Sequence, residues 1–179
     1  MISLQASDFE LFGLPTAFEL DRTQVDLQWK SLQREAHPDR FASEGAAAQR
    51  IAMQWSVRIN EAYNRLKDPL KRAAYLCELN GAAVNAENNT SMPSAFLMQQ
   101  MEWREALDDC KAIKAAHPKI EALEKLLDEV DASHAATLKQ IASFIDTHHN
   151  FVDAVAQVRA LMFIEKFAQE VQHQLDASN

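Results

Sequence analysis

The sequence predicts an all-α protein made of a helical hairpin flanked by short helices and a C-terminal three-helix bundle. The 179 residues contain only three glycines and five prolines, all at plausible element boundaries, whereas residues that favour helices are plentiful. Apolar residues recur at the three- and four-residue spacing of a buried helix face. No stretch has the pattern of a strand or a β-hairpin. The apolar share of 47% and the charged share of 25% are typical of a soluble globular protein.

The first domain is predicted to span residues 1–81 and to contain four helices. The expected helices cover residues 8–12, 21–36, 44–67 and 69–80. Asp21 is a favourable N-cap for the second helix, and Gln24 stands three residues later, as in a capping box. Pro69 suits the first turn of the fourth helix, and Gly81 suits its C-terminal end.

The two long helices of this domain each carry an apolar stripe. The stripes consist of Val25, Trp29, Leu32 and Ala36, and of Ile51, Trp55, Ile59, Ala62 and Leu66. Because both stripes follow the helical period, we expect the two helices to pack on each other as a hairpin. Trp29 and Trp55 are predicted to lie in the core between them.

The tip of the hairpin is the tripeptide His37-Pro38-Asp39. Pro38 disfavours helix at His37 and cannot sit inside a helix, so the turn is forced here. Asp39 can bond its own nearby backbone and hold the turn. Taken alone, the tripeptide is best explained as a simple helix stop, because short motifs often match by accident.

A basic face leads to this tip. Lys30 and Arg34 are four residues apart on the side of the second helix away from its apolar stripe, and Arg40 follows the turn. Such charges are most often a solvated face, and a binding surface is the alternative.

Residues 82–93 are predicted to be a linker, because they are polar, rich in asparagine and without apolar period. The second domain, residues 94–179, is predicted to be an antiparallel bundle of three helices with short connections. The expected helices cover residues 94–116, 118–147 and 151–175. Ser94 is the expected cap of the first, His117-Pro118 the break after it, and His148-His149-Asn150 the last turn.

The first helix of the bundle has two apolar faces. Its core-like stripe consists of Phe96, Trp103, Leu107 and Cys110, whereas Leu97, Met98 and Met101 lie to one side of it and are followed by Glu102 and Glu105. Leu97, Met101 and Glu105 are one turn apart and share a face. In the last helix, the run 161–164 is broader than one buried stripe. Excess apolar surface of this kind has two explanations, core packing and a partner site.

Charge and cysteine content exclude several classes of function. The net charge of −8 is concentrated in residues 82–179, which carry −7, and this argues against nucleic acid as a partner. Two cysteines are too few for a disulfide framework or a self-contained metal site, so Cys77 and Cys110 are expected to be buried apolar residues and no cofactor is predicted. His148 and His149 are expected in an exposed turn.

Membrane insertion and secretion are not expected. No apolar run approaches the roughly 18 residues that a membrane helix requires. Residues 1–9 lack the basic region of a secretory signal. A cytoplasmic location follows as the default expectation.

The arrangement of residues 8–75 resembles the J domain, the DnaJ-type module that stimulates ATP hydrolysis by a DnaK-class chaperone. The order of elements is a short helix, a basic helix, His-Pro-Asp, a long helix and a helix beginning with proline. Asn60-Glu61-Ala62-Tyr63, Leu66, Asp68-Pro69, Arg72 and Tyr75 continue the J-domain pattern. The resemblance implies that His37, Pro38 and Asp39 engage the chaperone near its nucleotide-binding lobe and interdomain linker. It also implies that Lys30, Arg34 and Arg40 steer the encounter with an acidic surface.

A narrower resemblance extends nearly from end to end. Residues 11–15, 33–41 and 96–98 are similar to the HscB family, the J-domain co-chaperones of bacterial iron–sulfur cluster assembly. The chain lacks the glycine/phenylalanine region and zinc domain of general DnaJ proteins, and the N-terminal cysteine motif of many eukaryotic members. The resemblance implies a chaperone of the HscA type and a scaffold protein of the IscU type as partners. The scaffold site would consist of Leu97, Met98, Met101, Glu102, Glu105 and Phe163, with Met101 where leucine is commoner.

The sequence therefore predicts a non-enzymatic adaptor that delivers an iron–sulfur scaffold to a chaperone and stimulates its ATPase. The alternative is a J-domain co-chaperone for a different folding client. A hydrolase that uses His37 and Asp39 has little support, because no nucleophile or pocket is evident beside them.

Overall fold

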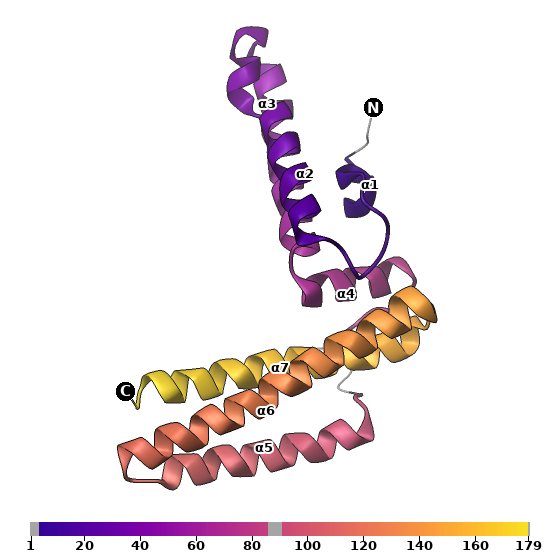
Figure 1. Cartoon of the computed structure of the whole chain (residues 1–179). Coiled ribbons are helices and arrows are strands. Elements are labelled where there is room, and N and C mark those ends of the chain that lie inside the picture. Colours follow the sequence, from indigo (N-terminus) through magenta and orange to yellow (C-terminus); the bar gives the residue numbers. More distant parts are fainter. Residues whose placement is uncertain (1–3, 86–90, 179) are drawn as a thin grey trace. The chain divides into compact units, whose positions relative to one another are not determined.

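The computed structural model describes residues 4–85 and 91–178, and this part of the chain is built from helices without strands, which confirms the all-α class (Figure 1). The chain divides into two compact units, Met1–Leu76 and Cys77–Asn179. The unit boundary falls inside a helix after Leu76, whereas the sequence places the end of the first domain at residue 81. The domain bounds 1–81, 82–93 and 94–179 remain a prediction.

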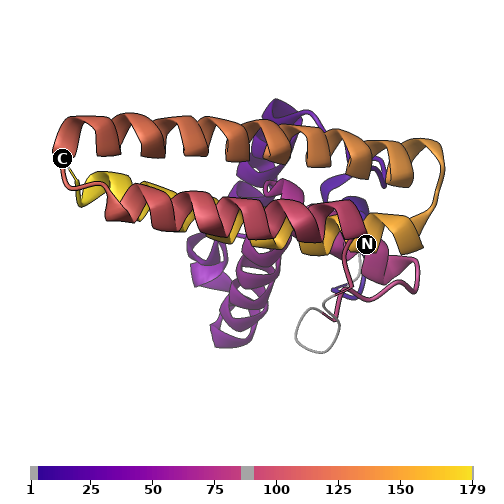
Figure 2. The ribbon, with the colours of Figure 1, turned by 90° about the horizontal axis from the view of Figure 1, so that it is seen from below.

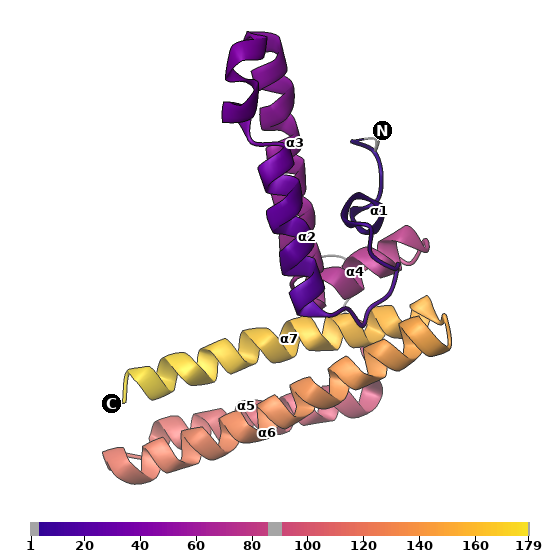
Figure 3. The same cartoon turned by 45° about the horizontal axis from the view of Figure 1, so that its top comes forward.

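The first unit is a helical hairpin with short helices at its base. The elements are α1 (Asp8–Phe12), α2 (Arg22–Glu35), the 3-10 helix η1 (Pro38–Glu44), α3 (Ala46–Leu66) and α4 (Pro69–Leu79), which continues past the boundary. The long helices α2 and α3 lie side by side, as the stripes predict (Figures 1 and 3).

The N-terminal caps differ from those predicted. The capping box occurs at α1, where Ser7 Oγ accepts from the Glu10 N–H at 3.2 Å and Glu10 Oε2 accepts from the Ser7 N–H at 2.8 Å. At α2, Asp21 is the N-cap, but its carboxylate accepts from the Thr23 N–H at 2.8 Å, and the capping box expected with Gln24 is not formed. A capping box requires the cap side chain to bond the third residue of the helix, here Gln24, whereas the Asp21 carboxylate bonds the second, Thr23.

The core of the first unit occupies the base of the hairpin. Its buried members include Phe9, Phe12, Val25, Ile59, Ala62, Leu66, Ala73 and Leu76. The predicted stripe on α3 is only partly buried, because Ile51 is 56% exposed and Trp55 is half-buried. Figures 1 and 3 show that the tip end of the hairpin extends beyond α1, and there η1 packs against α3. Trp29 is likewise half-buried and stacks on Tyr63 with ring centroids 4.7 Å apart.

A buried carboxylate joins α1 to α3 in this core. Asp8 is fully buried, and its oxygens lie 2.7 Å from Arg58 Nη1 and 3.2 Å from Arg65 Nη1. The Asp8 N–H donates to the Tyr75 hydroxyl of α4 at 3.1 Å. Removing one member of a buried ion pair leaves its partner charges uncompensated, which is strongly destabilising.

Asp8→Asn is therefore expected to lower the free energy of unfolding by about 3 kcal/mol, the lower end of the range for buried pairs because both arginines are partly exposed. Asp26→Asn removes the exposed pair with Arg22 in the same unit and is expected to cost about 1 kcal/mol or less. Urea denaturation of the full chain, followed by tryptophan fluorescence, measures both. Equal losses in the free energy of unfolding would show that the buried Asp8 pairs stabilise the fold no more than the exposed Asp26 pair does.

The second unit is a three-helix bundle. Its elements are α5 (Ser94–Ala112), α6 (Ala116–Ala142), a short π-helical segment η2 (Ser143–Thr147) and α7 (Phe151–Asp176). Figure 2 shows the three long helices running alongside one another. The buried core includes Phe96, Trp103, Leu107, Cys110, Leu123, Val130, Ile164, Phe167 and Val171.

Two details at the ends of α5 correct the prediction. Pro93, and not Ser94, is the N-cap residue, and no side chain caps this end. The helix ends at Ala112 and α6 already begins at Ala116, so the His117-Pro118 pair lies in the first turn of α6 and does not break α5. Proline is tolerated in the first turn because the N–H groups there have no partner within the helix.

The described ends of the predicted linker are anchored to the bundle, and its residues 86–90 lie outside the described residues. Arg159 of α7 is buried, and its Nε donates to the Val84 carbonyl at 2.8 Å while its Nη1 donates to the Ser91 carbonyl at 3.2 Å. Val84 is itself buried. The polar composition of residues 82–93 gave no sign of this anchorage, because it depends on an arginine far along the chain.

Candidate functional site

The tip of the hairpin is a short 3-10 helix that begins at Pro38, with His37 as its cap. His37 Nδ1 accepts from the Asp39 N–H at 3.3 Å, and the Arg40 N–H donates to the His37 carbonyl at 3.0 Å. The structure thus gives the capping role to His37, where Asp39 was expected. The Asp39 carboxylate is 91% exposed and lies 3.6 Å from His37 Nδ1. Since Nδ1 accepts a hydrogen bond, neutral His37 carries its proton on Nε2, where it is available as a donor.

The predicted basic residues are all exposed near this tip. Lys30 and Arg34 lie on the outer side of α2, and Arg40 Nη1 donates to the Arg34 carbonyl at 3.2 Å, which ties the turn to the end of the helix. At the other end of α2, the hydrogen bond from Arg22 holds the pKa of Asp26 below its usual value. We call Lys30, Arg34 and Arg40 the basic strip. It can attract an acidic surface to the tip.

The face of α5 that the sequence singled out is exposed in the bundle. Leu97, Met98 and Met101 are 44%, 67% and 74% exposed, and Glu102 and Glu105 are exposed beside them. The opposite stripe is buried, as predicted, because it forms the bundle core. Three neighbouring apolar side chains in water are an unfavourable arrangement that a partner can relieve.

Phe163, the sixth predicted scaffold residue, lies on α7 and not on α5. It is half-buried, and its ring centroid lies 5.8 Å from that of Phe96 and 5.9 Å from that of Phe167. The Arg104 guanidinium stands 5.6 Å from the Phe163 centroid and is ion-paired with Glu170. This hydrogen bond from Arg104 lowers the pKa of Glu170. Of the run 161–164, Leu161 and Ile164 are buried, so only its middle residues are available to a partner.

The predicted scaffold residues therefore spread over three parts of one surface. Leu97, Met101 and Glu105 follow the outer side of α5 one turn apart. Met98 and Glu102 line a groove of about 820 Å³ between α5 and α6, together with Glu129 and Ser133. Phe163 lies on the α7 side. A partner that covers all six residues has to span the width of α5.

Comparison with known proteins assigns the chain to a family. The family model described as the HSCB C-terminal oligomerisation domain matches residues 92–172. Proteins named "Co-chaperone protein HscB homolog" from Burkholderia multivorans and Burkholderia thailandensis are 48% and 47% identical over 176 residues, which cover 98% of each chain. The chain belongs to the HscB family. This confirms the resemblance inferred from the sequence.

Solved structures of HscB agree with this assignment. The chaperone HscB from Vibrio cholerae is 36% identical with a TM-score of 0.83, and the match covers 97% of this chain and 100% of that one. Human co-chaperone protein HscB has a TM-score of 0.84 over 97% of this chain and 84% of that chain, and at 21% identity it shows a common fold. The Burkholderia relatives are named as co-chaperones, a class whose members act by binding other proteins.

The two cysteines and the His148-His149 pair have the surroundings expected from the sequence. Cys77 and Cys110 are buried free thiols, as expected, and burial raises the pKa of Cys77 to about 11. His148 and His149 are exposed at the turn before α7. Over the described residues, no group of three histidine, cysteine or acidic side chains could hold a metal ion. Nor does this part of the chain contain a helix long and apolar enough to cross a bilayer.

Two residues beside these surfaces were not predicted from the sequence. Leu27 is 53% exposed on the same side of α2 as Lys30 and Arg34, and a helical projection of the sequence could have found it. Arg104 covers Phe163 only because α7 packs beside α5, and nothing in the sequence near Arg104 indicates that contact.

Proposed function

We propose that this protein is an adaptor that brings an iron–sulfur scaffold protein of the IscU type to a DnaK-class chaperone of the HscA type, and that it stimulates the ATPase of that chaperone. The setting is the bacterial cytoplasm. The observation that carries the proposal is the exposure of two chemically different surfaces on two compact units. One is the His-Pro-Asp tip with its basic strip, and the other is the apolar and acidic face of α5.

The first surface suits a partner whose conformational equilibrium has to be shifted. A ligand can shift such an equilibrium only by binding one state more tightly than the other. Pro38 fixes the start of η1, and the hydrogen bonds of His37 and Arg40 hold the turn before the chaperone is met. The turn then loses less conformational freedom on binding, and more of the contact energy is left for discriminating between chaperone states. The hydrolytic groups belong to the chaperone.

The second surface suits a scaffold that offers an apolar patch bordered by basic groups. Leu97 and Met101 supply exposed apolar area, and Met98 adds a flexible side chain that adapts to an irregular partner. Glu102 and Glu105 set orientation and exclude acidic partners. A general folding client would present varied unfolded segments, whereas side chains at fixed positions across the width of α5 favour one folded partner.

The client is tested by co-purification of the tagged full chain with the scaffold protein, and with an unfolded model client as the comparison. We expect a stoichiometric complex with the scaffold and none with the unfolded client. Capture of the unfolded client without the scaffold would favour the alternative, a J-domain co-chaperone with a different client.

A further inference from the structure

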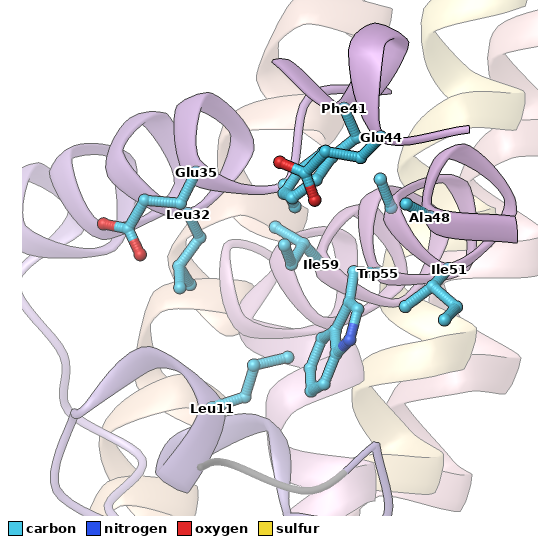
Figure 4. Close-up of a pocket in the computed structure, with 11 residues that line it drawn as sticks. Leu11, Leu32, Glu35, Phe41, Glu44, Ala48, Ile51, Trp55 and Ile59 are labelled. Atoms are coloured by element: carbon cyan, nitrogen blue, oxygen red, sulfur yellow. The ribbon is translucent and has the colours of Figure 1, made fainter. Parts of the chain in front are cut away.

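An apolar groove lies beside the hairpin tip, within the first unit, and neither the basic strip nor the α5 face includes it. Its volume is about 610 Å³. Leu11, Ala52 and Ile59 form a buried floor, and Phe41, Ile51 and Trp55 form walls that are half-buried or exposed. Figure 4 shows Trp55 reaching toward Leu11 at one end, with Phe41 and Glu44 at the opposite side.

The groove combines apolar walls with negative charge. Glu35 at the end of α2 and Glu44 at the end of η1 line it, and both residues are exposed. The opposite, outer side of α2 carries Lys30 and Arg34. The two sides of the hairpin therefore differ in sign, and the groove favours an apolar segment that carries a basic residue.

We propose that this groove binds an apolar side chain and an adjacent basic side chain of the same chaperone that engages the tip. The proposal rests on the proposed function. Continuity with the tip supports this occupant, because the seven residues of η1 provide Pro38 and Asp39 on the tip and Phe41 and Glu44 on the groove. A partner that holds the tip thus lies next to the groove. Charge limits the occupant further, because Glu35 and Glu44 favour a basic side chain over an acidic one.

The tip and the groove then have separate tasks. Contact at His37 shifts the chaperone toward its hydrolytic state, whereas the groove adds affinity and fixes the angle at which the hairpin approaches. Loss of the groove contact should raise the protein concentration needed for half-maximal ATPase stimulation. It should leave the maximal rate at saturation unchanged.

A matched pair of exposed residues on α3 tests this contact. Ile51 lines the groove and is 56% exposed, whereas Met53 is 57% exposed and does not line it. Ile51→Gln is expected to raise the half-maximal concentration about three- to ten-fold, the effect of losing part of one buried aliphatic side chain. Met53→Gln is expected to stay within about two-fold of the wild type. Circular dichroism and the thermal midpoint check that both variants are folded.

The charge is tested by Glu44→Lys, with Glu61→Lys, an exposed α3 residue outside the groove, as its control. Only Glu44→Lys should weaken half-maximal stimulation, and the loss should shrink at high salt. Equal behaviour of Ile51→Gln and Met53→Gln would overturn the groove contact while leaving the tip mechanism intact. Self-association that Ile51→Gln abolishes, with stimulation unchanged, would identify a second copy as the occupant and also overturn it. Absence of stimulation by the wild type would instead overturn the proposed function.

Discussion

His37→Gln is expected to abolish stimulation of the chaperone ATPase and to leave helix content and the thermal midpoint unchanged. The side chain is 56% exposed, so its loss costs little packing. Its Nδ1 accepts from the Asp39 N–H, which leaves Nε2 as the ring nitrogen that can contact the chaperone. Glutamine carries a donor on a longer, flexible side chain and cannot reproduce the rigid ring.

The measurement is the steady-state ATPase rate of the chaperone with saturating wild-type or variant protein. His117→Gln is the control, since His117 is 85% exposed and lies in α6, far from the tip in sequence. Full stimulation by His37→Gln would remove the basis for treating the tip as a J-domain contact. Loss of stimulation in both variants would point to a general defect.

Leu97→Ala combined with Met101→Ala is expected to weaken scaffold binding by about 100-fold or more, because truncating two exposed apolar anchors at the centre of an interface costs about 3 kcal/mol or more. Both side chains are in water in the free protein, so the double variant should keep its stability. Adding Phe163→Ala should deepen the loss. It should also cost stability, since Phe163 packs on Phe96 and Phe167.

Isothermal titration of the scaffold measures this effect, with Val152→Ala as the control. Val152 is 76% exposed, close to the 74% of Met101, and it lies on α7 and does not line the groove that contains Met98 and Glu102. Its truncation should leave the Kd within about two-fold. Wild-type affinity in the double variant would place the scaffold elsewhere on the molecule.

The fold could be predicted because its elements are long and periodic. The two long helices of the hairpin and the first helix of the bundle carry stripes that repeat over several turns, and prolines and glycines mark most of the breaks between helices. The helix ends were less predictable, as at α5, because several residues near each end are acceptable caps. The exposed and buried faces of α5 were also predictable, since one helix with two apolar faces can bury only one of them in a three-helix bundle.

Features that depend on distant segments could not be predicted. Ile51 follows the helical period of its stripe but is 56% exposed, because burial depends on which other segments pack against α3 at that point. The Asp8 pairs join residues 50 or more positions apart, and Arg159 reaches back to Val84 and Ser91. At the tip, both His37 and Asp39 have side chains that can cap a turn, and only the backbone geometry decides between them.

The central claim is that one molecule couples the scaffold to the chaperone ATPase. The most direct measurement compares four rates: chaperone alone, with this protein, with the scaffold, and with both. We expect the rate with both to exceed the sum of the separate increments, and Leu97→Ala/Met101→Ala to remove this excess while keeping the increment due to the tip. A rate with both components that equals the sum of the separate increments would contradict the claim.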